Sequence, residues 1–297
     1  MELGVCRWRP DDSDEAIELL LGQGVDIIEA PPSFVMDFDD AGVQANSQRL
    51  GSAGIRINVC HGPFFHDDDF SVLDDSARAS ALEKQVVALR RTALTGAHCM
   101  VVHPSGPIKA GEAPARLDNL RAGLDVMLKT AEECGVKLAL ENMLPDHLCS
   151  RTSDLRAMLT EFDTPLLSVC FDVGHANIGP EDLIEAITAL EDRIIAFHLH
   201  DNDGTRDIHV QPPYGSIDWP TLTEKLLSLN FERPFSIECD PWNQAPLSVL
   251  LREMRSIFAG KMPIETDCCG QRVWSLCPKC RHYFFESDSG PICACGA

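Results

Sequence analysis

The chain has 297 residues, 44% of them hydrophobic, which is ordinary for a globular protein and enough for one large domain or two smaller ones. Its 25 Lys and Arg against 46 Asp and Glu give a net charge of −21, the opposite sign to that of most nucleic-acid-binding proteins. No apolar run approaches the roughly 20 residues that span a bilayer, and the N-terminus lacks the pattern of a secretory signal, so we expect a cytoplasmic protein without a membrane partner.

Residues 1–260 alternate between short β-rich runs and longer runs with helical periodicity. The β-rich runs predict strands over 3–8, 25–30, 55–61, 98–104, 137–143, 166–172, 194–200 and 235–240. The intervening runs predict helices over 14–24, 40–54, 76–94, 115–135, 152–162, 180–190, 219–230 and 246–260, of which 40–54 has the weakest pattern.

Eight strand–helix units over 1–260 predict an α/β fold with a parallel sheet closed into a (β/α)8 TIM barrel. A doubly wound open sheet is the alternative, but no Gly-x-Gly-x-x-Gly motif follows the first predicted strand. The sequence therefore favours the barrel.

Six consecutive predicted strands, the third to the eighth, end in an imidazole or a carboxylate. The residues at or just beyond these ends are His61, His103, Glu141, Asp172, His175, His198, His200, Asp207, His209 and Glu238. Any one of them alone is more often a hydrogen-bonded structural residue. At the active-site face of a barrel, however, so many polar groups would repel one another without a ligand. The pattern therefore predicts a divalent metal, one of Mn²⁺, Zn²⁺, Mg²⁺, Co²⁺ or Fe²⁺.

The motifs FDVGHAN (171–177) and HLHDNDG (198–204), together with Glu141 and Glu238, resemble the xylose isomerase-like barrel superfamily over residues 1 to 258. That superfamily includes sugar and sugar-phosphate isomerases and epimerases, inosose dehydratases and type IV apurinic endonucleases. The resemblance to the isomerases and epimerases implies one metal ion, held by Glu141, Asp172, His198 and Glu238. Asp201, Asp203 and Gly204 are typical of a turn.

The same resemblance implies a mechanism in which Glu141 and Glu238 remove and return a proton at the substrate carbon from opposite faces. The metal would stabilise the enediolate, and the substrate would be a small sugar, sugar phosphate or cyclitol. The residues expected to contact that substrate are His61, Phe64, His103, His175 and His200.

The endonuclease branch implies a different centre, in which three zinc ions have nine ligands. This sequence offers a candidate for each in the same order, namely His61, His103, Glu141, Asp172, His175, His198, Asp207, His209 and Glu238. A phosphodiesterase with two or three metals is therefore the alternative function. The acidic segment HGPFFHDDDF (61–70) disfavours DNA, because binding to the phosphate backbone draws on Lys and Arg. Its Phe64 and Phe65 lie where the endonucleases place an aromatic that enters DNA, although they also suit the apolar lining of a sugar pocket.

Six of the 13 cysteines crowd into residues 268–295 of a tail, 264–297, whose composition differs from the rest. Cys277-x-x-Cys280 and Cys293-x-Cys295 predict a structural Zn²⁺ site in a zinc-ribbon-like module. Because the second pair is not Cys-x-x-Cys, Cys268 or Cys269 is an alternative ligand, and His282 is another. We expect this module to be structural or to contact a partner or a second copy of the chain. A barrel that only displays it is the non-enzymatic alternative.

Overall fold

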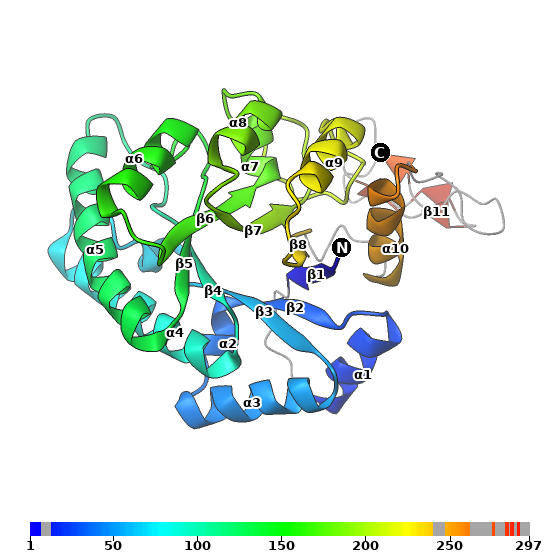
Figure 1. Cartoon of the computed structure of the whole chain (residues 1–297), viewed down its shortest axis with the longest axis horizontal. Helices are drawn as coiled ribbons and strands as arrows, with labels where there is room; N and C mark the ends of the chain where they lie inside the picture. Colours follow the sequence, from blue (N-terminus) through cyan, green and yellow to red (C-terminus); the bar gives the residue numbers. More distant parts are fainter. Residues whose placement is uncertain are drawn as a thin grey trace.

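A computed structural model describes residues 1–6, 13–239 and 247–261, together with the backbone of four two-residue strands within 275–291. Eight parallel strands follow one another in chain order around a closed barrel, and helices form a ring outside it (Figure 1). The predicted (β/α)8 barrel is confirmed. No helix in the described part of the chain is long and apolar enough to cross a membrane.

The strands lie within the predicted runs. They are β1 (Leu3–Cys6), β2 (Ile27–Ala30), β3 (Arg56–His61), β4 (Cys99–Val102), β5 (Lys137–Glu141), β6 (Leu167–Asp172), β7 (Ile194–Leu199) and β8 (Phe235–Ile237). The helices are α1 (Asp14–Gly22), α2 (Pro32–Met36), α3 (Asp40–Ser52), α4 (Asp75–Thr95), α5 (Ala113–Cys134), α6 (Thr152–Phe162), α7 (Val173–Ile178), α8 (Leu183–Leu190), α9 (Trp219–Ser228) and α10 (Leu247–Phe258). The weakly patterned segment 40–54 forms α3, whereas α2, α7 and the 3-10 turn η1 (His66–Asp68) lie outside the predicted helices.

Small side chains close the interior of the barrel. This inner cluster consists of Val59, Cys99, Val101, Ala139, Cys170 and Ala196, and it is separate from the larger apolar core beneath the helices. Because side chains alternate along a strand, the residue two positions beyond an interior residue also points inward. His103 lies two positions beyond Val101, and Glu141 lies two positions beyond Ala139, so both point into the barrel. The polar residues at the strand ends therefore form the next layer of side chains above this inner apolar cluster.

No disulfide links the cysteines of the described barrel to one another, and five of the seven are buried. Burial raises the pKa of both Cys60 and Cys149 to about 12, so they behave as small apolar residues. In the tail, β9 (Ser275–Leu276) pairs with β10 (Tyr283–Phe284), and β11 (Glu286–Ser287) pairs with β12 (Gly290–Pro291). Cys277, Cys280, Cys293 and Cys295 lie outside the described residues, so the zinc module and the division of the chain at 260–264 stay predictions.

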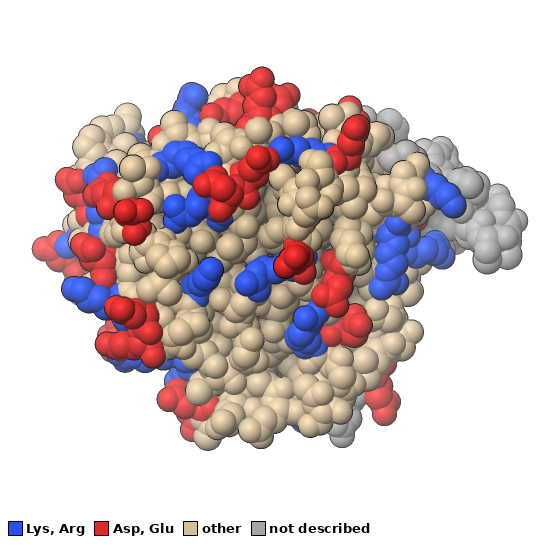
Figure 2. Space-filling view, viewed as in Figure 1, with Lys and Arg blue, Asp and Glu red and all other residues tan. Residues whose placement is uncertain are grey.

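Ion pairs join neighbouring elements of the outer ring. Arg121 on α5 meets Glu161 on α6 at 2.9 Å, and Lys225 on α9 meets Glu191 at 2.7 Å. On the face of the molecule shown in Figure 2, basic and acidic side chains are interspersed. Exposed pairs of this kind stabilise a fold by about 0–1 kcal/mol each, so they contribute less than the apolar core.

The segment between β7 and α9 is fixed by Asp201. This residue is fully buried, and its carboxylate accepts hydrogen bonds from Trp219 Nε1 at 2.7 Å and from the backbone N–H groups of Gly215 at 2.9 Å and Ile217 at 3.2 Å. The expectation that Asp201 is a simple turn residue is therefore wrong. Asp203 does cap a turn, since it accepts from Thr205 and Arg206.

We predict that Trp219→Phe destabilises the fold. The substitution keeps the buried aromatic ring but removes the Nε1–H donor, leaving the Asp201 carboxylate short of one hydrogen bond, at a cost of about 1–3 kcal/mol. Urea unfolding monitored by circular dichroism measures the change. Leu227→Ala, at a half-exposed position on the same helix, is the matched control. Equal midpoints for the two variants would contradict this role of Asp201.

Candidate metal centre

Three carboxylates surround the imidazole of His198. Its Nδ1 lies 2.9 Å from Glu238 Oε2, 3.3 Å from Glu141 Oε1 and 3.6 Å from Asp172 Oδ2. One atom from each of the four residues lies within 4.8 Å of every other. All four side chains are at most 7% exposed. The structure thus brings together the set predicted for a single metal ion.

The local structure explains why these side chains meet. Glu141 and Asp172 are the last residues of β5 and β6, and a register shift at Val169/Cys170 adjusts the pairing of β6 with β7 ahead of Asp172 and His198. Asn142 fixes Asp172 from the neighbouring strand, because its amide donates to Asp172 O and accepts from Asp172 N, both at 2.8 Å. Adjacent strands therefore hold adjacent donors in register.

A second group surrounds the other oxygen of Glu141. Oε2 lies 3.0 Å from His103 Nε2 and 3.8 Å from His61 Nε2. The ring of Phe64 packs against His61 with centroids 4.7 Å apart and against His103 at 5.1 Å. Glu141 thus faces two donor groups, one through each oxygen.

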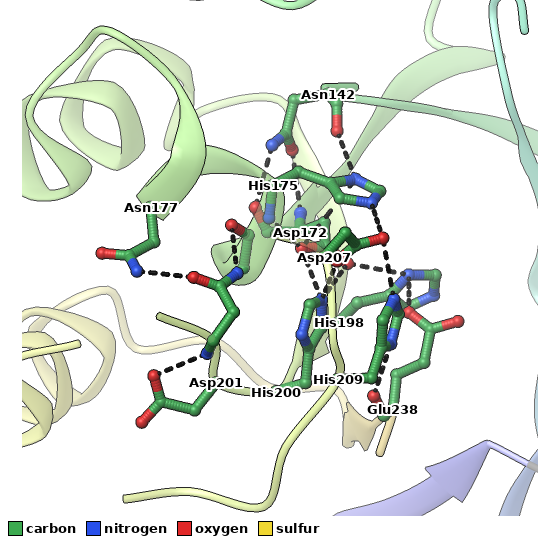
Figure 3. Close-up of polar contacts among 12 residues, drawn as sticks. Asn142, Asp172, His175, Asn177, His198, His200, Asp201, Asp207, His209 and Glu238 are labelled. Carbon is green, nitrogen blue, oxygen red and sulfur yellow. Dashed lines mark hydrogen bonds and ion pairs between the residues drawn. The ribbon is translucent and has the colours of Figure 1, made fainter. Parts of the chain in front are cut away.

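A third group lies beside α7 and the β7–α9 segment. Asp207 Oδ2 is 3.4 Å from His175 Nε2 and 3.1 Å from His209 Nε2, and these three residues also satisfy the 4.8 Å limit (Figure 3). His175 Nδ1 is held at 2.9 Å by the backbone O of Asn142, and His209 Nδ1 at 2.9 Å by that of Glu238. His209 has a positive φ of 43°, which is a strained backbone conformation for a histidine. Residues far apart in sequence therefore form a compact set.

His200, which was expected to contact the substrate, lies outside the lining of the cavity above the metal-binding residues. It is fully buried, its Nε2 lies 3.0 Å from Asp172 Oδ1, and its ring stacks on His209 at 3.8 Å. Gly174 makes room for it, because a Cβ on that glycine would lie 2.0 Å from the His200 ring. His200 thus contacts Asp172 and His209 on the side away from the cavity, and it does not border the cavity itself.

The charges of this cluster compensate one another. Burial alone would lower the pKa of His198, but the neighbouring carboxylates, led by Glu238, raise it well above its usual value. Burial likewise lowers the pKa of His209, yet Asp207 and Glu238 bring it to about 9. Burial would raise the pKa of Glu141, but the histidines hold it well below its usual range. Glu141 is thus charged, and His198 and His209 carry protons that a cation can replace.

The donor chemistry fits a divalent cation. Among the described residues, Asp207 Oδ1 is a buried carboxylate oxygen without a hydrogen bond, and Glu141 Oε2 accepts none of good geometry although His103 is close. Buried carboxylate oxygens are costly unless they are paired or bind a metal. Imidazole with carboxylate is a ligand set that suits Zn²⁺, Mn²⁺, Co²⁺ or Fe²⁺.

A cavity of about 580 Å³ opens above the donors. Apolar side chains from several loops, including Phe64, Met143 and Leu144, form part of its wall. Its lining contains one lysine and one arginine, Lys109 and Arg116, and Arg116 is buried in an ion pair with Asp69. Five acidic residues share the lining, namely Asp69, Glu112, Glu141, Asp207 and Glu238. The volume and mixed lining suit one small polar molecule.

Glu29 is a buried acidic residue of the site that was absent from the predicted set. It lies near the end of β2, is 2% exposed, and its Oε1 is 3.0 Å from His198 Nε2. The signal was present in the sequence, because VDIIEA (25–30) places a carboxylate at a strand end as the later strands do. Asn142, which directly follows Glu141 in the sequence, also had no assigned role.

Among curated proteins, the chain is 30% identical over 192 residues to an uncharacterised protein of Methanocaldococcus jannaschii, covering 61% of this chain and 63% of that protein. It is 26% identical over 204 residues to a probable endonuclease 4 of Bacillus subtilis, covering 62% and 66%. It thus spans less than two thirds of the length of either. A D-psicose 3-epimerase of Enterocloster bolteae is 27% identical over 126 residues, covering 42% of this chain and 39% of that protein.

Solved structures with the same fold include a D-tagatose 3-epimerase-like protein, with a TM-score of 0.74 and 24% identity, covering 88% of this chain and 97% of that one. A 3-keto-D-glucoside 4-epimerase from E. coli has a TM-score of 0.73 and 19% identity, covering 86% and 99%. The TM-scores show that these proteins share the fold of this chain, and at such low sequence identity the likeness shows the fold alone. The family model of the xylose isomerase-like TIM barrel matches residues 17–255, most of the chain. The chain therefore belongs to the xylose isomerase-like TIM barrel family.

Proposed function

We propose that this protein is a divalent-metal-dependent epimerase or isomerase of a small carbohydrate. The observation that carries the proposal is the placement of Glu141 and Glu238. Both border the cavity, they come from β5 and from the end of β8, and each has an oxygen within 3.3 Å of His198 Nδ1. Two carboxylates from different strands of the barrel suit the transfer of a proton to and from opposite faces of one carbon.

The residues that would hold the cation are Glu141, Asp172, His198 and Glu238. A bound divalent cation would polarise the carbonyl of a sugar and lower the pKa of the C–H group on the neighbouring carbon. Glu141 and Glu238, which the histidines keep charged, would accept and return the proton. His175, His61 and His103 border the same cavity and would donate or accept hydrogen bonds with sugar hydroxyls.

A carbohydrate fits the cavity better than a nucleic acid does. Phe64 and Met143 offer apolar surface to the C–H faces of a sugar, while the histidines offer donors and acceptors. The acidic lining and the net charge of −21 disfavour a polyphosphate backbone, whose binding depends on Lys and Arg. The epimerases among the solved structures with this fold support the same substrate class.

The second candidate is a hydrolase with two or three metals, and one observation favours it. His175, Asp207 and His209 form a compact donor set that a single-metal epimerase does not need. Together with His61 and His103 on the far oxygen of Glu141, they complete the nine ligands predicted for a three-metal centre. The likeness to probable endonucleases 4 points in the same direction.

Glu238→Gln should abolish proton exchange at the substrate carbon. The amide cannot act as a base, so we expect turnover of a ketose such as D-psicose, and entry of solvent deuterium into it, to fall by about 10²–10⁴-fold. Mass spectrometry of the product measures deuterium entry. Glu185→Gln, at an exposed position on α8, is the control. Exchange at the wild-type rate in Glu238→Gln would rule out the acid–base role.

Metal content separates the two candidates. In a background where the six tail cysteines are serine, elemental analysis should give about one ion per chain for the epimerase and two or three for the hydrolase. Asp207→Ala with His209→Ala should leave the count unchanged in the first case and lower it by one in the second. Three ions, together with cleavage of abasic DNA, would contradict our proposal.

The third donor group also has a defined pH dependence. The pKa of His209 is raised to about 9, so its imidazole is protonated at pH 7 and a cation must displace that proton. If this group binds a metal, its affinity should rise by about tenfold per pH unit between pH 7 and 9 and then level off. Calorimetric titration with Zn²⁺ measures the slope, and the same slope in His209→Ala would disprove this assignment.

A further inference from the structure

The imidazole of His198 is held from both sides. Nδ1 faces the carboxylates of the metal centre, with Glu238 Oε2 at 2.9 Å, whereas Nε2 points the other way and lies 3.0 Å from Glu29 Oε1. His198 is fully buried and Glu29 is 2% exposed, so water does not compete for either contact. The imidazole ring of His198 therefore lies between the carboxylate of Glu29 on one side and the carboxylates of the metal centre on the other.

Backbone geometry aims Glu29 into the barrel. It pairs with Cys6 on β1 and with Val59 on β3, and the register between β2 and β3 shifts between Ile28 and Glu29. Shifts of this kind redirect side chains and recur beside active sites. β2 is not a neighbour of β7, so the side chain of Glu29 reaches His198 across the barrel interior.

The contact with His198 is not one link of a wider structural network. The second oxygen of Glu29, Oε2, is buried and has no hydrogen-bond partner within the described residues. Burying a carboxylate is costly unless a specific partner offsets its lost hydration. In the described part of the chain, the hydrogen-bond partner of this carboxylate is His198.

An imidazole that binds a cation through one nitrogen keeps its proton on the other. A carboxylate at the second nitrogen accepts that proton in a hydrogen bond, fixes the ring orientation and raises the basicity of the ligating nitrogen. Without such an acceptor, the neutral ring could place its proton on Nδ1 and donate it to Glu238 or Glu141, which would block the metal position.

We propose that Glu29 is a positioning residue that holds His198 with its proton on Nε2, so that Nδ1 is free to bind the divalent cation. This inference rests on the proposed metal centre and deepens it. Glu29 does not touch the substrate in this role; it acts through His198.

The test is the affinity of the purified full-length chain for Mn²⁺, with tail cysteines replaced by serine and free Mn²⁺ followed by electron paramagnetic resonance. Glu29→Ala should weaken binding by about 10–100-fold, the range typical for loss of a carboxylate behind a metal-bound histidine. Glu29→Gln keeps an oxygen that can accept from Nε2–H, so its affinity should lie between those of wild type and Glu29→Ala. Glu253→Ala removes a buried glutamate on α10, away from the cavity, and should bind as wild type does.

The outcomes separate the two proposals. Tight Mn²⁺ binding by wild type with an unchanged dissociation constant in Glu29→Ala would overturn the positioning role and leave the metal centre standing. Wild type that binds no divalent cation would overturn both. If Glu29→Ala does not fold, Glu29→Asp keeps the charge but shortens the side chain, and it must show the same loss of affinity; wild-type affinity in that variant would equally refute the role.

Discussion

The concentration of charge at one mouth of the barrel is the constraint on which the rest of the site depends. Glu29, Glu141, Asp172, Asp207 and Glu238 are carboxylates that share this volume with six imidazoles. Neither kind of group is stable there alone, because burial penalises a charge that has no partner. The small interior residues below and the helical ring outside provide the rigidity that holds such groups at contact distance.

The sequence predicted the barrel because its alternation of strands and helices is a simple pattern. The rule that parallel strands end on one face placed the polar residues of the third to eighth strands at one mouth of the barrel. The choice of Glu141, Asp172, His198 and Glu238 as one set came from the resemblance to the isomerases and epimerases. Glu29 follows the same rule on the second strand. The burial of His200 depends on Gly174, a glycine whose close approach to the ring is a property of the fold. The sequence around Asp201 is typical of a turn, and the hydrogen bond from Trp219, 18 residues further along the chain, is a property of the folded structure.

Glu141 connects the two functional candidates. One of its oxygens faces His198 and the other faces His103, so the same side chain belongs to a single-metal site and to a larger centre. The polypeptide therefore has the geometry for more than one type of chemistry, and the strand ends alone do not choose between them. The choice lies with the loops, which set the shape of the cavity and supply Asp207 and His209.

The candidate metal ligands come from two kinds of element, the strands of the barrel and the segment between β7 and α9. Glu141, Asp172 and His198 belong to hydrogen-bonded strands, whereas Asp207 and His209 belong to a segment anchored at its start by Asp201. Strand residues cannot be altered without disturbing their neighbours, but a loop between two fixed points tolerates substitution and changes in length. Because Asp207 and His209 come from the segment between β7 and α9, a change confined to that segment would alter the donor set while leaving the barrel intact.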